Sequence, residues 1–331
     1  MTALAALALL AACGAPATQS QGRSARPSVA STSGRASPSA SPPASPADRV
    51  RVSIERWRLP FPVAREAVIS DEQHPGRVVV AGGLLPGDRS TARSFRLDPA
   101  TGRAQDLSAL GVPVHDAAGG TYAGNPAVYG GGNATEQSLV QALVGDRWRI
   151  VDRMPTGRSD LAVLDTTSAT LVIGGYDGVN VPTQILRQRG SRPLRPWGAL
   201  SVGVRYASVA LRGGAGYVFG GEVDQRELGA VQRVDLSTGR SRVVARLPRP
   251  LGHAQTATFG SRILLMGGRT DPDTQTDQMW WFDPATSRFT RAGRLPAALS
   301  DAATFVSGSS AWLLGGESPS MTDHVIRIRV S

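Results

Sequence analysis

The stretch Leu171-Val172-Ile173-Gly174-Gly175 places three apolar residues directly before a pair of glycines. The same pattern, a short apolar run that ends in Gly-Gly, recurs five more times, in residues 78–83, 127–131, 217–221, 263–268 and 312–316. The second glycines of successive pairs are separated by 48, 44, 46, 47 and 48 residues. A repeat of about 40–50 residues is typical of β-propeller blades. The spacing therefore predicts six blades.

The apolar run and the two glycines have separate structural meanings. A short apolar run without a helical period indicates a strand that is buried on both faces. Two glycines at its end allow positive φ angles and a close approach to a neighbouring strand. None of the six pairs continues as Gly-x-Gly-x-x-Gly into a helical pattern, which excludes a dinucleotide-binding turn of that kind.

Each repeat can be divided into four strands, and the fifth repeat serves as the example. Its predicted strands are residues 253–258, 262–268, 279–282 and 288–294. Between the last two lies Asp283-Pro284-Ala285-Thr286-Ser287, in which Asp and Pro favour a tight turn. Glycine is abundant and long amphipathic helical patterns are absent from the sequence, so we expect an all-β fold with four-stranded antiparallel blades.

The two ends of the repeat array indicate how the ring closes. The last repeat provides three predicted strands, in residues 302–306, 312–316 and 324–330. Residues 52–60, before the first repeat, have the Leu-Pro ending of an outer strand. We predict that this N-terminal strand completes the last blade, because pairing the termini protects an otherwise exposed edge. Residues 49–331 are then one six-bladed propeller.

The double glycine, together with an aromatic residue in the outer strand, resembles the Kelch repeat of β-propellers. Trp148 and Phe289 stand at that aromatic position, seven residues before the proline that closes their repeat. Galactose oxidase shares the Kelch architecture and uses a copper-bound Tyr linked to a Cys, whereas the single cysteine of this chain is Cys13. Sialate mutarotases are also similar, with six Kelch blades, but no site residue can be transferred from them. We therefore expect no cofactor, no metal and no assigned catalytic residue.

The first residues resemble a bacterial lipoprotein signal. Residues 3–12 are apolar and lead into Leu10-Ala11-Ala12-Cys13, which is similar to a lipobox, where the cysteine becomes lipidated. A chance cysteine in an ordinary secretory signal is the alternative. Residues 14–48 are rich in Ala, Ser, Pro and Arg and are predicted to be a disordered linker. The resemblance implies a signal over residues 1–13 and an extracytoplasmic propeller that a lipid at Cys13 anchors to the cell membrane.

The net charge of +10 suggests nucleic-acid binding at first sight, but its distribution argues against it. All 36 basic residues are arginine, and in the repeat region they are interspersed with acidic residues instead of forming a basic block. A nucleic-acid-binding surface is expected to concentrate positive charge on one face. We therefore expect no nucleic-acid partner, and we expect a monomer.

Charged residues recur at two points of each repeat that a propeller brings to the same face. The loop before the first strand and the loop after the double glycine both emerge around the channel mouth. The candidate ligand-binding residues in these loops are Arg65, His115, Arg158, Arg205, Glu222, His253, Arg269 and Glu317. Arginine can hold an anionic group through two parallel hydrogen bonds. The alternative is that these residues form turns and ion pairs between blades.

Two functional hypotheses follow from this face. The first is a recognition module that binds a protein or a cell-envelope glycan; the second is a carbohydrate-active enzyme similar to a sialate mutarotase. An enzyme requires a deep channel pocket in which a carboxylate with a perturbed pKa faces an arginine. A recognition module is expected to have a shallow mouth with exposed apolar loop tips such as Leu84-Leu85. The acidic loop 270–277 is interpreted as solvated, because it lacks the glycine and the distal Glu of a calcium-binding EF-hand.

Overall fold

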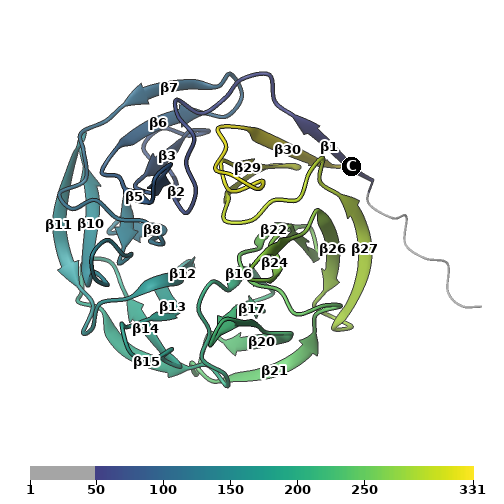
Figure 1. Ribbon diagram of the computed structural model, residues 1–331. Coiled ribbons are helices and arrows are strands. Elements are labelled where there is room, and N and C mark those ends of the chain that lie inside the picture. Colours follow the sequence, from purple (N-terminus) through teal and green to yellow (C-terminus); the bar gives the residue numbers. More distant parts are fainter. Residues whose placement is uncertain (1–48) are drawn as a thin grey trace, which may run out of the picture. The chain divides into compact units, whose positions relative to one another are not determined.

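The computed structural model describes residues 49–331, which form six antiparallel sheets of four strands each around a central axis (Figure 1). All regular elements in these residues are strands, and no helix there could cross a membrane. The predicted all-β, six-bladed fold is confirmed. The predicted lipoprotein signal and linker, residues 1–48, lie outside the described residues.

The blades follow one another along the chain, and the strands of each blade run in order from the channel outward. Blade 1 contains β2 (Ala67–Ser70), β3 (Val78–Ala81), β6 (Ser94–Asp98) and β7 (Arg103–Asp106). Blade 2 contains β8 (Ala118–Tyr122), β9 (Asn125–Tyr129), β10 (Leu139–Val144) and β11 (Arg147–Arg153). Blade 3 contains β12 (Ser159–Asp165), β13 (Thr170–Tyr176), β14 (Gln184–Gln188) and β15 (Arg195–Ala199).

The second half of the ring repeats this order. Blade 4 contains β16 (Ser208–Arg212), β17 (Ala215–Phe219), β20 (Ala230–Asp235) and β21 (Ser241–Arg246). Blade 5 contains β22 (Gln255–Phe259), β23 (Arg262–Met266), β26 (Gln278–Asp283) and β27 (Arg288–Arg294). Blade 6 contains β28 (Ala303–Ser307), β29 (Ser310–Leu314), β30 (Val325–Val330) and β1 (Val50–Ile54).

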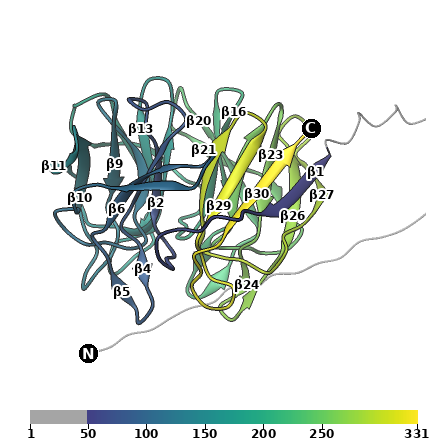
Figure 2. The same ribbon diagram turned by 90° about the horizontal axis from the view of Figure 1, so that it is seen from above.

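The ring closes through the N-terminal strand, as predicted. β1 pairs with β30 in antiparallel register, from Val50 opposite Val330 to Ile54 opposite Ile326. Figure 1 shows β1 on the outside of blade 6, and Figure 2 shows it beside β30. The first and last segments of the propeller thus hold one blade together, which covers the edge that β30 would otherwise expose.

The apolar runs of the sequence lie in the second strand of each blade. β3, β17 and β29 are buried along their whole length, whereas the outer strand β7 is exposed throughout. The buried side chains form a layer between each pair of neighbouring blades; Phe95 of blade 1, for example, packs in one cluster with Trp312 of blade 6. Burial between two sheets explains why these strands are continuously apolar instead of alternating.

The glycine pairs connect each blade to the next. Gly174 and Gly175 have φ angles of 66° and 96°, and the N–H of Gly175 donates a 2.9 Å hydrogen bond to the carbonyl oxygen of Val204 in blade 4. A Cβ on Gly174 would collide with that same oxygen. Equivalent hydrogen bonds join Gly83 to Val114, Gly131 to Arg158, Gly221 to Leu251, Gly268 to Leu299 and Gly316 to Val63. Two glycines recur because the inter-blade contact leaves no space for a side chain.

Three blades carry an additional two-stranded hairpin directly after the glycine pair. These hairpins are β4–β5 (Leu84–Leu85, Arg89–Ser90), β18–β19 (Glu222–Val223, Arg226–Glu227) and β24–β25 (Arg269–Asp271, Thr274–Gln275). Figure 2 shows β4, β5 and β24 extending from the same end of the propeller. The acidic loop 270–277 is part of the third hairpin, and Asp271 and Asp273 are exposed there as expected. The hairpins raise a rim around one mouth of the channel.

Candidate functional site: a charged mouth at one end of the channel

One residue at or just before the start of each inner strand has a left-handed backbone, with φ between 52° and 59°. These six residues, which we call the mouth ring, are Arg65, Asp116, Asp160, Tyr206, His253 and Asp301. Each N–H donates a hydrogen bond of 2.9–3.2 Å to the carbonyl oxygen of the ring member in the preceding blade, so that the bonds close a circle. A left-handed conformation costs a non-glycine residue roughly 1–2 kcal/mol, and such strain concentrates at functional sites.

Backbone pairing brings the residues after the glycine pairs to the mouth ring. Glu222 pairs with Arg205, and Glu317 pairs with Ser300, the residues that immediately precede ring members Tyr206 and Asp301. Arg269 is held in the same way beside blade 5. The two groups of loops that the sequence assigns to one face therefore converge because each glycine pair turns the chain back beside the start of an inner strand.

Arg65 and Arg269 are held by shared carboxylates. Arg65 lies 3.2 Å from Asp116 and 3.4 Å from both Asp301 and Glu317. Arg269 lies 2.8 Å from Asp301 and 2.6 Å from Glu317. Burial would raise the pKa of Asp301, but His253 and the two arginines more than offset it and hold that pKa well below its usual range. The guanidinium groups are thus fixed in place before any ligand arrives.

A second group of contacts surrounds Tyr206. Arg205 forms a 2.6 Å ion pair with Asp160 and donates a 3.2 Å hydrogen bond to the Tyr206 hydroxyl. The Tyr206 ring stacks on the His253 ring with centroids 3.9 Å apart, and the guanidinium of Arg65 lies 5.8 Å from the Tyr206 centroid. Because Arg65 belongs to blade 1 and Tyr206 to blade 4, these contacts extend across the mouth.

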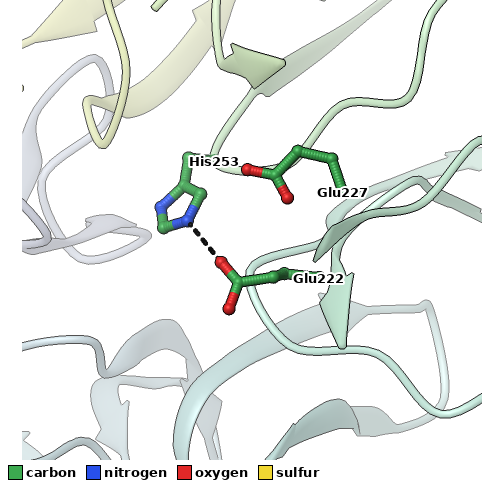
Figure 3. Close-up of side chains that lie close together, drawn as sticks. All are labelled: Glu222, Glu227 and His253. Atoms are coloured by element: carbon green, nitrogen blue, oxygen red, sulfur yellow. Dashed lines mark hydrogen bonds and ion pairs between the residues drawn. The ribbon is translucent and has the colours of Figure 1, made fainter. Parts of the chain in front are cut away.

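His253 lies between two carboxylates from different blades. Its Nδ1 is 2.6 Å from Asp301, and its Nε2 is 3.4 Å from Glu222 (Figure 3). Burial disfavours the imidazolium, but Asp301 and Glu222 outweigh burial and raise the pKa of His253 to about 9. Glu227 lies beside this pair, and its two carboxylate oxygens are buried without a hydrogen-bond partner.

Two acidic groups of the mouth titrate near neutrality. Burial and the neighbouring charge of Asp116 raise the pKa of Asp160 to about 7, although Arg205 opposes the shift. Burial and the charge of Glu222 likewise raise the pKa of Glu227 to about 7. A carboxyl group that exchanges its proton near pH 7 can serve as an acid or a base. Such groups are frequent at functional sites, although structural ion pairs produce them as well.

Seven of the eight candidate residues lie at this mouth. They are Arg65, His115, Arg205, Glu222, His253, Arg269 and Glu317. Arg158 differs, because it is 1% exposed and donates hydrogen bonds to the carbonyl oxygens of Gly174 and Gln184. Its expected role at the ligand face is corrected by this burial: Arg158 connects backbone segments of blade 3 instead of facing a ligand.

Three residues of the mouth were not among the candidates: Asp160, Tyr206 and Glu227. Asp160 and Tyr206 occupy mouth-ring positions that are aligned in the sequence with Arg65 and His253. Counting a constant distance back from each glycine pair, without selecting for charge, would have found Tyr206. Glu227 lies on the far strand of a hairpin that the sequence pattern does not reveal.

The mouth contains two clefts. The larger, about 800 Å³, is lined by Arg65, His115, Arg269 and Glu317, together with Leu84, Pro86 and Met321. The other, about 610 Å³, lies beside Arg205 and includes Tyr176, Val202 and Asp224. Leu84, expected as an exposed loop tip, is 7% exposed, because it packs under the β4–β5 hairpin and pairs with Ala64.

The central channel has a different lining. Its cavity of about 260 Å³ is enclosed by the six inner strands, whose lining residues are mainly small and apolar. Glu66 is the one acidic residue among them; it is 5% exposed and neither carboxylate oxygen has a hydrogen-bond partner. Burial raises its pKa well above the usual range. No arginine lines this cavity, so the deep carboxylate–arginine pair that a sugar-converting channel requires is not found among the lining residues.

Comparisons with known proteins agree with this architecture. A family model of the Kelch motif matches residues 250–296, which correspond to blade 5. No curated protein matches the chain. The solved structure of YjhT superposes with a TM-score of 0.70 at 15% sequence identity, covering 83% of this chain and 99% of that one. At this identity the likeness concerns the fold alone. The protein is a six-bladed β-propeller that contains a Kelch motif.

Proposed function

We propose that the propeller is a recognition module that binds a carbohydrate chain of the cell envelope at the charged mouth. The observation that carries this proposal is the cleft of about 800 Å³ between blades 1, 2, 5 and 6. Its volume falls in the range of small-ligand pockets, roughly 300–1,000 Å³. A protein partner would be expected to cover a broad surface of about 800 Å² on each side. A concave site therefore favours a saccharide over a protein.

The lining of the cleft suits a ligand with many hydroxyl groups. Arg65 and Arg269 provide hydrogen-bond donors and Glu317 provides an acceptor, while a sugar hydroxyl can act as both. The ion pairs already fix these side chains, which lowers the conformational entropy lost on binding. Pro86 and Met321 add apolar surface that can contact the C–H face of a sugar ring. Because the arginines are neutralised by carboxylates, a strongly anionic ligand is disfavoured.

Blocking the cleft tests this assignment without disturbing the ion pairs. Met321→Trp should lower the affinity for cell-envelope oligosaccharides by about tenfold or more, since it fills space at the cleft wall. The matched control is Val179→Trp, which adds the same bulk at the other cleft of the mouth. Isothermal titration of each variant with oligosaccharide fractions measures the effect. Equal affinity in both variants, or capture of a protein in place of a saccharide, would contradict the proposal.

The titration of two acidic groups favours a second candidate function, a sugar-converting enzyme. Asp160, with a pKa of about 7, lies 2.6 Å from Arg205 and faces the mouth ring. This pair could move a proton on a bound sugar. If so, the protein should accelerate the interconversion of sugar anomers, followed by NMR, and Asp160→Asn should remove the acceleration. An unchanged rate with and without protein would leave recognition as the function.

We also propose that a lipid at Cys13 anchors the propeller outside the cell membrane, with residues 14–48 as a linker. The support is the lipobox-like quartet and the composition that follows it. Cys13→Ala should move the protein from the detergent phase to the aqueous phase in a detergent partition, whereas Ser20→Ala should not. Partition of the Cys13 variant with the detergent would contradict lipidation.

A further inference from the structure

The β18–β19 hairpin places two glutamates directly opposite each other. Glu222 and Glu227 are register partners on neighbouring antiparallel strands. Like charges at such positions repel and destabilise the hairpin. Both oxygens of Glu227 are moreover buried without any hydrogen-bond partner, which leaves an acceptor group unsatisfied. The hairpin therefore contains an arrangement that a bound cation would stabilise.

His253 adds a nitrogen donor to this pair. It extends from the start of blade 5 towards the hairpin of blade 4, as Figure 3 shows. One potential ligand atom from each of Glu222, Glu227 and His253 lies within 4.8 Å of the other two. We propose that these three residues bind one divalent transition-metal ion, with Zn²⁺ as the best fit. An imidazole with two carboxylates suits Zn²⁺ better than Ca²⁺ or Mg²⁺, which prefer oxygen ligands alone.

The orientation of His253 supports this assignment. Asp301 lies 2.6 Å from Nδ1, so that Nε2 faces the two glutamates. A carboxylate that accepts a hydrogen bond from the far nitrogen is the usual support of a metal-binding histidine, because it fixes the tautomer and the ring direction. Tyr206 stacks on the ring at 3.9 Å and restricts its rotation further. The nitrogen donor is therefore positioned before an ion arrives.

The separations match the size of a zinc ion. Two ligands bound about 2.0–2.1 Å from a tetrahedral Zn²⁺ lie about 3.3–3.4 Å from each other. Nε2 of His253 and Oε2 of Glu222 are 3.4 Å apart. Glu227 lies on a two-residue strand at the rim, and rotation of its side chain can close the remaining distance. Three protein ligands leave a fourth position open for water or for a hydroxyl group of a ligand at the mouth.

The cations around this cluster are already neutralised. Arg269 is the nearest basic group of blade 5, and it is paired with Asp301 and Glu317 at 2.8 and 2.6 Å. Arg205 on the opposite side is paired with Asp160 at 2.6 Å. Neither guanidinium is paired with Glu227, whose carboxylate remains available to the ion.

The test is titration of the chelator-treated full chain with Zn²⁺, followed by calorimetry. We expect one ion per chain, and we expect Glu227→Gln to weaken binding by about a hundredfold, since even residues that only support a metal ligand typically contribute about 10–100-fold. Glu317→Gln is the matched control, because this glutamate lies at the same mouth but is paired with arginines; it should change the affinity by less than about twofold. Absence of saturable binding, or equal weakening in both variants, would overturn the proposal.

Thermal unfolding provides a second readout that distinguishes a metal site from a structural contact. Without metal, Glu227→Gln should melt at a higher temperature than the parent chain, because it removes the repulsion from Glu222. With excess Zn²⁺ the order should reverse, since the ion stabilises only the chain that binds it. If Zn²⁺ shifts the melting temperature of both chains equally, the ion binds elsewhere and the proposal is wrong. This outcome would leave the glycan proposal untouched, because that proposal depends on the cleft beside Met321.

Discussion

The glycine pairs and the mouth ring lie a short distance apart at the same end of the blades, and both connect neighbouring blades by backbone hydrogen bonds. At the glycine pairs the sequence is the same in all six blades. At the mouth ring it changes from Arg65 to Asp116, Tyr206 and His253. The difference lies in the space around the Cβ: a Cβ on Gly174 collides with a carbonyl oxygen, whereas the ring side chains extend into the mouth.

This comparison separates the residues that build the propeller from those that give it chemistry. The ring position requires a left-handed φ and nothing else from its side chain, so each blade can present a different group to the mouth. The glycine position requires the absence of a side chain. Loops positioned by a rigid scaffold are the usual carriers of function, and in this propeller the two requirements lie within the same turn of each blade.

The largest expected effect comes from breaking the glycine contact. Gly174→Ala should reduce the free energy of unfolding by about 3–5 kcal/mol, because φ strain and a collision with Val204 add together. Gly190→Ala in the same blade is the matched control: its φ is 57°, but a Cβ there meets no atom within 4 Å. We expect it to cost only about 1–2 kcal/mol. Urea unfolding measures both, and equal losses would show that φ strain alone explains the glycine pairs.

A smaller loss is expected from removing one member of the mouth network. Arg65→Met should destabilise the protein by about 2–4 kcal/mol at neutral pH, because Asp116, Asp301 and Glu317 lose a shared cation in a partly buried site. The loss should shrink as the pH falls and these carboxylates become protonated. Urea unfolding of the parent and variant across the acidic range measures this trend. A loss that does not depend on pH would indicate that packing, not charge, makes Arg65 important.

Glu66 is expected to oppose stability. The residues at its position in the other blades are Ala117, Leu161, Ala207, Ala254 and Ala302. Because its folded-state pKa is raised above the unfolded value, Glu66 destabilises the protein increasingly as the pH rises above that unfolded value. Glu66→Leu should therefore raise the free energy of unfolding by about 1–3 kcal/mol at pH about 8, and the gain should disappear at acidic pH.

The control for this change is Glu72→Leu, because Glu72 is an exposed glutamate of the same blade. Its free energy of unfolding should change by less than about 0.5 kcal/mol. If Glu66→Leu destabilises the protein at every pH, the carboxylate has a partner in solution, such as a buried water.

The sequence predicts the parts of this molecule that repeat. The spacing of the glycine pairs gives the number of blades, and the Leu-Pro ending after Trp57 gives the ring closure, because both follow from contacts that every blade must make. The outer strand of blade 3 is also present, as β15, although it lacks that Leu-Pro ending.

The features that occur in single blades are those that the sequence does not predict. Arg158 occupies a repeated position with a charged residue, yet its side chain turns into the protein because backbone carbonyls are available there. Glu227 becomes the partner of Glu222 only through a hairpin of two-residue strands, which is too short to leave a periodic pattern. Repetition carries no information about such contacts, since they depend on which side chains meet across the ring.

The smallest effect is expected at the outer rim, where an ion pair resembles those of the mouth in geometry. Arg294 lies 2.8 Å from Asp277, but the two side chains are 55% and 27% exposed, against 19% for Arg65. Solvent screens such a pair and the side chains lose entropy in forming it, so Arg294→Met should cost only about 0.2–1 kcal/mol. Added salt should reduce this cost further, while the cost of Arg65→Met should change less. Urea unfolding of both variants at low and high salt compares them directly. Equal costs would mean that burial at the mouth adds nothing to the strength of its ion pairs, and the fixed arginines on which the proposed glycan site depends would then be no more rigid than those of the rim.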